Sequence, residues 1–498
     1  MFYFSKSKYC LAKQCPKLLW LNKYRPDLIP EDPALQARFD EGNAVGDLAM
    51  GLFGDFTEVT AFKEDGKLDL NKMQAKTIEC MENGVENICE ASFSYNGLYC
   101  AVDILRKQNG GYAIYEVKSS THTSPIYAAD IAYQKYVLQK CGINVTGTYL
   151  IHIDSSYTRK DKLETDKLFK IVDLANEVAI EYPNVPSLLE MAEEVYAMGT
   201  APETDIGTHC RDPYDCAFWD FCTNTLPQPN VFDLYRINFK KALGYYYDNT
   251  SDFESLYSCG EIKNKTQLRQ IKHQLNNLPD EIDQKGIANF LSTLSYPIYF
   301  LDFETMQSVI PKFEGSRPYE QVPFQYSLHY IEYEGGPLLH KEFLAESGTD
   351  PRRAIAESLC KDIPTNVCVT AYNKSFECSR LRELAALYPD LADHLLNIAD
   401  NIKDLLTPFQ SGYYYNKAMG GTFSIKSVLP ALFPNDPALN YHNLDQIHNG
   451  TEAMTIFPLI KDMPIDEQRT TRENLLKYCE LDTLAMVKVW EKLKSAVE

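Results

Sequence analysis

Three cysteines at six-residue intervals, Cys210, Cys216 and Cys222, constrain the fold of this chain more than any other feature of its sequence. Three thiolates complete neither a tetrahedral metal site nor a cubane cluster, so a fourth ligand has to come from elsewhere. The N-terminal segment offers Cys10 and Cys15. A metal centre built from these residues would bring the two ends of one domain together.

The predicted compartment favours metal ligation. The chain begins with Met1 to Lys6 and continues with charged residues, in place of the apolar core of a secretory signal. No apolar run reaches the length of a membrane span, so we expect a cytoplasmic protein without a membrane partner. In a reducing cytoplasm, fourteen cysteines favour metal or cluster ligation over disulfides. Buried core cysteines are the alternative interpretation.

The length of the chain predicts more than one core. Its 498 residues, 45% of them hydrophobic and 24% charged, suffice for two or three domains. Residues 224–230 follow the cysteines and contain two prolines, which indicates a boundary. A mostly helical stretch then leads to a buried-strand pattern at 296–301. We expect a first domain over residues 1–225, a helical linker region over 226–291 and a last domain over 292–498.

Both domains are predicted to be α/β. In the first, the expected order is a helix, two strands joined by the hairpin signal Asn109-Gly110-Gly111, a helix and a strand. Their predicted ranges are 33–52, 97–107, 112–119, 125–141 and 145–153. In the last domain, three strands near Tyr296, Gln321 and Pro337 precede a helix, a strand over 366–372 and further helices.

Two carboxylates and a lysine are predicted to meet on the hairpin of the first domain. Glu116 and Lys118 are two residues apart on one strand, so they share a face. Antiparallel pairing can bring Asp103 beside them. Bringing two carboxylates together costs free energy because their charges repel, unless a metal ion and an anionic substrate bind there. A solvated strand face would also explain the pattern.

Together with the following helix 130–136, this pattern resembles the PD-(D/E)XK motif of the RecB-like nucleases, over about residues 1–225. The resemblance implies a restriction-endonuclease-like fold in which Asp103 and Glu116 ligate Mg²⁺ or Mn²⁺, with Glu90 as an extra ligand. It implies that Lys118 stabilises the transition state or helps to activate water, and that Gln134 contacts the site. The family's histidine after the first helix's glycine is absent, since Gly46-Asp47 follow Gly42 here, and Leu138 replaces its tyrosine.

The cysteines extend this resemblance to the iron–sulfur members of the family, the AddB and CRISPR-adaptation nucleases. In those proteins one early cysteine in a Cys-Pro-basic context joins three late ones, and Cys15-Pro16-Lys17 has that context. The resemblance implies that Cys15, Cys210, Cys216 and Cys222 hold a 4Fe–4S cluster. Zinc is the alternative, because thiolates suit both metals.

A second set of acids lies in the last domain. Asp302 and Glu304 share one face at the end of a strand, and Glu377 follows the junction of a strand and a helix. Tyr478 and Asp482 are four residues apart on the final helix, so they also share a face.

These motifs, in this order, resemble the DnaQ-like DEDD 3′–5′ exonucleases of the tyrosine subtype, over about residues 292–498. The resemblance implies a ribonuclease-H-like fold in which Asp302, Glu304, Glu377 and Asp482 ligate two divalent ions, while Tyr478 orients the water. Glu377 stands where the family generally has Asp. The joined arrangement of both domains resembles a bacterial two-domain family of unassigned function.

The segment 421–427 contains Lys426, which is a candidate phosphate contact; a solvated loop is the alternative. His442 is expected to be a surface or core residue rather than a catalytic one.

The net charge of −20 argues against a large sequence-independent grip on phosphates. Metal ions at carboxylates can nevertheless hold an acidic enzyme on a nucleic acid. The sequence therefore predicts a nuclease acting on single strands or ends of DNA or RNA. The alternative is a non-catalytic nucleic-acid-binding or scaffold component of a repair, defence or CRISPR-related complex.

Overall fold

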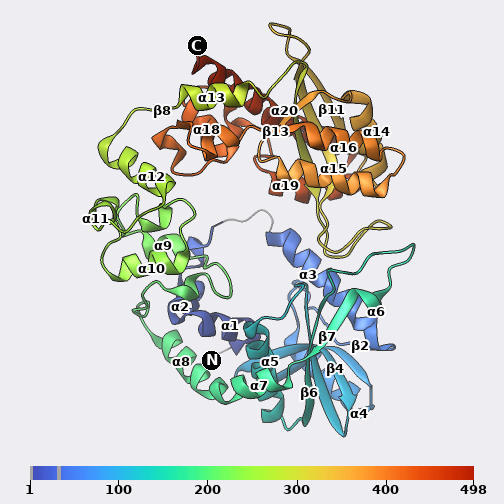
Figure 1. Cartoon of the computed structure of the whole chain (residues 1–498). Coiled ribbons are helices and arrows are strands. Elements are labelled where there is room, and N and C mark those ends of the chain that lie inside the picture. The colour runs from blue at the N-terminus through green and yellow to red at the C-terminus, as the bar shows by residue number, and fades with distance from the viewer. Residues whose placement is uncertain (1–3, 31–34) are drawn as a thin grey trace. The chain divides into compact units, whose positions relative to one another are not determined.

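The computed structural model describes residues 4–30 and 35–498, which form two compact units (Figure 1). The first unit comprises the described residues up to Thr225 together with Ser308–Glu320, and the second comprises Leu226–Gln307 and Gln321–Glu498. Both mix helices with a sheet, which confirms the α/β class. The division falls at the expected residue 225, but two expectations need correction. Residues 226–291 belong to the second unit, and 308–320 belong to the first.

The first unit contains a sheet of order β2-β3-β4-β5-β6-β7, with β1 pairing in parallel to β4. Strands β3, β4 and β5 are antiparallel, β6 runs parallel to β5, and β7 is antiparallel to β6. The bounds are β1 (Phe4–Ser5), β2 (Thr57–Glu58), β3 (Asn87–Tyr95), β4 (Leu98–Gln108), β5 (Gly111–Lys118), β6 (Val145–Ile153) and β7 (Phe169–Asp173).

The predicted hairpin is confirmed as β4 and β5, and its turn explains why. Asn109 has φ 50° and Gly110 has φ 74°, and two consecutive positive φ values are what a tight hairpin turn requires. The strand predicted at 145–153 is confirmed as β6. Strand β3 is not predicted by the sequence analysis.

Helices cover both faces of this sheet. One face is covered by α1 (Lys6–Gln14), α5 (Pro125–Lys140), α7 (Ala175–Glu181) and α8 (Val185–Ala197), whose apolar residues form one core with β3 and β4. The other face is covered by α3 (Leu35–Met50), and Val309 of segment 308–320 joins that second core. The predicted helices 125–141 and 33–52 are observed as α5 and α3; Pro33 and Ala34 lie outside the described residues. The remaining α-helices of the unit are α2 (Pro16–Tyr24), α4 (Leu70–Glu82), α6 (Thr165–Leu168) and α9 (Trp219–Thr223).

The second unit contains a sheet of order β11-β10-β9-β12-β13. Strands β9, β10 and β11 are antiparallel, whereas β12 and β13 continue the sheet in parallel with β9. The bounds are β9 (Ile298–Met306), β10 (Val322–Ile331), β11 (Leu339–Leu344), β12 (Cys368–Ala371) and β13 (Ile402–Asp404). All four strands predicted in this domain are therefore confirmed.

The two faces of this sheet carry different helices. Tyr299, Leu301 and Phe303 point into a core with α14 (Arg352–Asp362), α15 (Ser375–Leu387) and α16 (Ala392–Asn401). The alternate residues of β9 face the long helix α20 (Ile465–Ser495), where Phe300 meets Trp490. This period-two alternation sends Asp302 and Glu304 to the α20 face.

Residues 226–291 have a small core of their own within the second unit, built by η5 (Val231–Asp233), α10 (Phe239–Tyr247), α11 (Phe253–Ser258) and α12 (Lys265–Asn276). They are tied to the rest of the unit by β8 (Glu281–Ile282), which pairs with β14 (Tyr414–Tyr415), and by α13 (Gln284–Leu291), which contacts α20. Among the described residues, no helix combines the length and the apolar character needed to cross a membrane.

Candidate functional sites

The rear centre, defined as Asp302, Glu304, Glu377, Tyr478 and Asp482, lies in the second unit. Asp302 and Glu304 come from β9, and one oxygen of each lies within 4.8 Å of the other and of the Cys479 sulfur on α20. The α20 helix also carries Tyr478 and Asp482, which are both buried one turn apart. Strand alternation and helical periodicity therefore aim four of the five side chains at the same interface.

The carboxylates of the rear centre repel one another in a buried setting. Burial raises the pKa of Asp302 well above its usual value, and Asp482, Glu377 and Glu304 raise it further. Burial and Asp482 likewise raise the pKa of Glu304. Burial raises the pKa of Asp482 to about 6, although hydrogen bonds from Tyr441 and Tyr478 oppose the shift. Such a group of acids is stabilised by cations.

Glu377 lies in the first turn of α15 and is almost fully buried. Burial raises its pKa to about 8, and Asp404 adds to the shift. Its Oε2 has no hydrogen-bond partner among the residues that the structure describes. An orphaned, buried carboxylate oxygen near Asp302 fits a role as a metal ligand, so the donor set of the rear centre fits divalent ions.

Two residues besides the five that define the rear centre contact it directly. The Tyr441 hydroxyl donates to Asp482 Oδ1 at 2.6 Å, and Lys426 Nζ donates to the Tyr478 hydroxyl at 3.2 Å. Lys426 was a candidate on other grounds, whereas Tyr441 has no local signal in the sequence. Its neighbour His442 is exposed, as expected.

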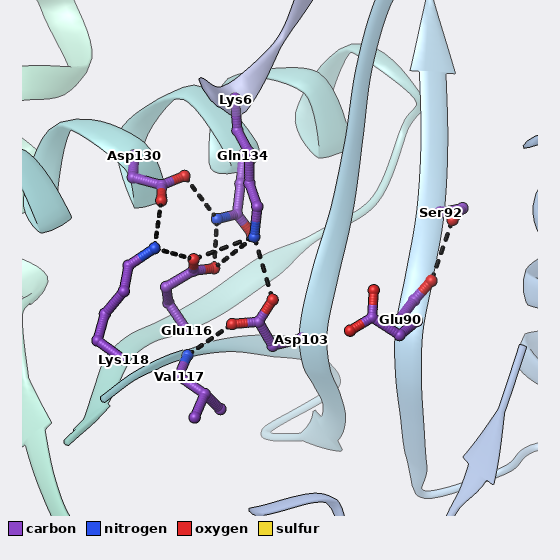
Figure 2. Close-up of polar contacts among 9 residues, drawn as sticks. All are labelled: Lys6, Glu90, Ser92, Asp103, Glu116, Val117, Lys118, Asp130 and Gln134. Carbon is purple, nitrogen blue, oxygen red and sulfur yellow. Dashed lines mark hydrogen bonds and ion pairs between the residues drawn. The ribbon is translucent and has the colours of Figure 1, made fainter. Parts of the chain in front are cut away.

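The front centre, defined as Glu90, Asp103, Glu116, Lys118 and Gln134, lies in the first unit (Figure 2). The ladder between β4 and β5 stops at the pair Ile104–Tyr115, so the two strands separate at Asp103. Asp103 Oδ2 accepts the Val117 N–H at 2.7 Å in place of a backbone oxygen. The separation opens a space at the sheet in which side chains can meet.

Glu116 is the hub of the front centre and is only 1% exposed. Lys118 Nζ lies 2.6 Å from Glu116 Oε1, and Gln134 Nε2 donates to Glu116 Oε2 at 2.7 Å (Figure 2). Asp130, one turn before Gln134 on α5, accepts from both: 3.0 Å from Lys118 Nζ and 3.0 Å from Gln134 Nε2. Asp130 was not singled out as a site residue from the sequence.

Lys6 is a second cation that the sequence analysis missed. It follows β1, and its Nζ lies 3.1 Å from Asp103 Oδ1 and 3.0 Å from Glu116 Oε1 (Figure 2). Although burial opposes the charge, Asp103 and Glu116 raise the pKa of Lys6. In the other direction, Lys118 and Lys6 overcome the effect of burial and hold the pKa of Glu116 below its usual value.

Glu90 has an unusual backbone. Its φ is 57° within β3, and the register passes from the pair Cys89–Ile104 to Ala91–Val102 without pairing it. Left-handed backbone at a non-glycine residue is strained and is often retained at functional sites. Burial raises the pKa of Glu90 to about 7, with Asp103 as the next cause. The carboxylates Glu90, Asp103 and Glu116 are ligands of the type that a divalent ion prefers, and Lys6 Nζ lies between those of Asp103 and Glu116.

The four predicted cluster ligands come from the two ends of the first unit. Cys15 lies between α1 and α2 and caps both, whereas Cys210, Cys216 and Cys222 lie in or near η4 (Thr208–Cys210) and α9. All four are free thiols. Burial raises the pKa of Cys216, and a backbone hydrogen bond opposes the shift. The nearby thiols of Cys210, Cys222 and Cys15 raise the pKa further, so the four cysteines interact. Cys10, in contrast, interacts electrostatically with Lys118 of the front centre and with Asp130, which contacts that centre.

The surroundings of these thiols suit a metal centre. Cys15 and Cys216 lie among apolar side chains that include Leu18, Leu21 and Phe218. The Gly207 N–H donates to Cys210 Sγ at 3.5 Å, a contact of the kind that tunes cluster sulfurs. Four thiolates are a ligand type that suits both predicted centres, iron–sulfur and zinc, and these thiols interact electrostatically with one another.

Comparisons with known proteins cover part of the chain. A family model described as "Domain of unknown function (DUF2779)" matches residues 299–424, a range that contains Asp302, Glu304 and Glu377 but ends before Tyr478. "Uncharacterized protein MG366 homolog" of Mycoplasma pneumoniae is 26% identical over 47% of this chain and 39% of its own length. "Uncharacterized protein UU173" of Ureaplasma parvum is 27% identical over 44% of this chain and 34% of its own length. The chain thus spans less than half the length of the curated relatives it matches.

Proposed function

We propose that this chain is a divalent-metal-dependent nuclease that hydrolyses phosphodiester bonds of DNA or RNA, with a DEDD 3′–5′ exonuclease site at the rear centre. The observation that carries the proposal is the burial of Asp302, Glu304 and Asp482 at one sheet–helix interface with raised pKa values. The sheet of antiparallel and parallel strands is compatible with a ribonuclease-H-like fold. Metal ions would offset the repulsion and attract phosphates.

The residues of the rear centre have distinct roles in this proposal. Asp302, Glu304, Glu377 and Asp482 would hold divalent ions, which activate water and stabilise the leaving oxygen when bound. The Tyr478 hydroxyl is near Asp482 and Lys426, so it can orient a water by donating a hydrogen bond. Lys426 is exposed, and its ammonium can contact a substrate phosphate while remaining beside Tyr478.

Digestion of single-stranded DNA and RNA tests the proposal directly. Strands labelled at the 5′ end should shorten progressively with Mg²⁺ or Mn²⁺, and a metal chelator should stop the reaction. Glu304→Gln should remove this activity because one ion loses a ligand. Equal degradation by wild type and Glu304→Gln would place the activity elsewhere. Absence of both degradation and metal binding would favour the scaffold alternative.

We propose a second nuclease site of the RecB-like PD-(D/E)XK type at the front centre. The observation that favours it is the contact of Lys118 with Glu116 and its electrostatic interaction with Asp103, since these are the three residues of the motif. Glu90 would supply the ligand that the missing histidine provides in the family. Lys118 can stabilise charge on a phosphate once it is drawn from Glu116 to the substrate.

The cysteines would hold a 4Fe–4S cluster that ties the ends of the first unit together. Protein purified without oxygen should be brown and contain iron and sulfide. Cys216→Ser should lose the iron and destabilise the first unit. A loss of 1 kcal/mol in the free energy of unfolding lowers the midpoint of a domain of this size by roughly 2–4 °C, so we expect a fall of at least about 4 °C. Cys259→Ser, at an exposed cysteine of the second unit, is the matched control. Stoichiometric zinc without iron would exclude the iron–sulfur cluster.

A further inference from the structure

Two histidines face each other on the sheet of the second unit, outside the rear centre. His329 of β10 and His340 of β11 are direct partners in the antiparallel register. Their ring centroids are 4.5 Å apart, with an angle of 35° between the rings. His329 is buried and His340, on the edge strand, is partly exposed, so solvent can reach one side of the pair.

Helix α20 adds a carboxylate to this pair. Glu480 contributes one oxygen, and His329 and His340 contribute one nitrogen each, with all three atoms within 4.8 Å of one another. The three side chains come from three different elements, so no local sequence pattern predicts that they meet. Glu342 lies within electrostatic range of His340 and Glu480, and its own side chain is exposed.

Both imidazoles are oriented by hydroxyl groups. His329 Nδ1 lies 2.8 Å from Thr483 Oγ1, and His340 Nε2 lies 2.9 Å from Ser327 Oγ. The two hydroxyls are themselves 2.7 Å apart. Each ring therefore has one nitrogen held in place and the other directed elsewhere. Metal-binding histidines are typically fixed in this way by a hydrogen bond at the second nitrogen.

We propose that His329, His340 and Glu480 form a binding site for a divalent transition ion of the zinc type, with Glu342 beside it as a further carboxylate. Imidazole nitrogens combined with carboxylate suit such an ion, whereas Mg²⁺ and Ca²⁺ prefer oxygen ligands throughout. The ion would join β10 and the edge strand β11 to α20 at a point between Tyr478 and Asp482. Its role is therefore to hold the helix that carries two residues of the rear centre, and the site does not depend on nuclease activity.

Cobalt binding tests the proposal on the full chain. Metal-stripped protein is titrated with Co²⁺ in excess Mg²⁺, which occupies the oxygen-only sites, and the visible absorption and bound equivalents are measured. His340→Gln places an amide near Nε2, so it keeps the contact with Ser327 while removing the other nitrogen. The wild type should bind one equivalent of Co²⁺ more than His340→Gln, and Zn²⁺ should displace it. His442→Gln, at an exposed histidine of the same unit, should bind as the wild type does.

Glu480→Gln separates loss of binding from loss of folding, because it changes only one oxygen on a helix surface. Circular dichroism should match the wild type, while the same equivalent of Co²⁺ is lost. If both variants retain the full stoichiometry, the histidines form a hydrogen-bonded pair and the proposed site does not exist. Binding of the extra equivalent by Mg²⁺ as well as by Co²⁺ would also overturn the assignment to a transition ion.

Discussion

The front and rear centres gather acids in similar ways and neutralise them in different ways. In each, carboxylates of a sheet meet a helix, α5 in the first unit and α20 in the second. In the front centre, Lys6 and Lys118 contact Glu116 at 3.0 and 2.6 Å (Figure 2). In the rear centre, the one lysine that makes a described contact, Lys426, reaches the Tyr478 hydroxyl rather than a carboxylate.

This difference shows in the pKa of Glu116, whereas the other two carboxylates of the front centre, Asp103 and Glu90, have pKa values raised to about 6 and about 7 by burial. Glu116 has a lowered pKa because two ammonium groups overcome the effect of its burial. Asp302 and Glu304 have raised pKa values because burial and repulsion from Asp482 act together. Burial raises the pKa of Asp482 against the opposing effects of Tyr441, Lys426 and Tyr478. The front centre thus has two ammonium groups in contact with Glu116, whereas in the proposed function metal ions would offset the repulsion among the carboxylates of the rear centre. Four experiments test this contrast.

The largest expected effect comes from removing a rear ligand. Asp302→Ala should lower metal-dependent 3′–5′ degradation by roughly 10³-fold, at the upper end of the loss seen when a charge-stabilising group is removed. The measurement is the rate of loss of 5′-labelled strands in a Lys118→Ala background. Asp462→Asn, at an exposed acid of the same unit, should keep full activity. Degradation that persists in Asp302→Ala would contradict the assignment of the rear centre.

A front-centre lysine should matter for chemistry and less for folding. In an Asp302→Ala background, Lys118→Ala should reduce the remaining cleavage by roughly 10²-fold because the transition-state charge loses its partner. Lys67→Ala, at an exposed lysine that pairs with the exposed Asp65, is the control. Unchanged cleavage would make the first unit a binding module, and the contrast between the centres would then be one between binding and catalysis.

The tyrosine of the rear centre should have a milder effect. Tyr478→Phe keeps the ring packed against Tyr441 and removes only the hydroxyl that contacts Asp482 and Lys426. We expect the turnover number to fall by about tenfold, equivalent to about 1.4 kcal/mol in the barrier. Affinity for Mn²⁺ should change little. A fall as large as that of Asp302→Ala would show that Tyr478 has more than an orienting role.

The smallest effect concerns the dependence of stability on pH. Because Asp482 has its pKa raised to about 6, the folded rear centre binds protons more tightly than the unfolded chain. Its stability should therefore fall as pH rises from about 4 to about 6, and saturating Mn²⁺ should reverse the loss at higher pH. The shift in unfolding midpoint on adding Mn²⁺ should be a few degrees, larger at pH 8 than at pH 5, and smaller in Asp302→Ala. If the shift in unfolding midpoint on adding Mn²⁺ did not depend on pH, the raised carboxylate pKa values could not distinguish the rear centre from the front centre.

Much of the fold followed from local patterns. The hairpin of β4 and β5 was predictable because Asn109 and Gly110 tolerate the positive φ that its turn needs. Glu116 and Lys118 were placed on one face by strand alternation, and Tyr478 and Asp482 by helical periodicity. These relations involve residues close in sequence, so local backbone geometry was enough to predict them.

Other parts depend on contacts between segments that are distant in the sequence. Lys6 meets Asp103 across 97 residues, and Tyr441 meets Asp482 across 41. Strand β3, with its left-handed Glu90, and the membership of 308–320 in the first unit also escaped the sequence analysis. Each depends on which surfaces become buried together, and burial of a lysine or a tyrosine beside a carboxylate leaves no periodic signature in the chain. The residue types that can do chemistry were therefore visible from the sequence, whereas the charge balance at each centre was set by packing between distant segments.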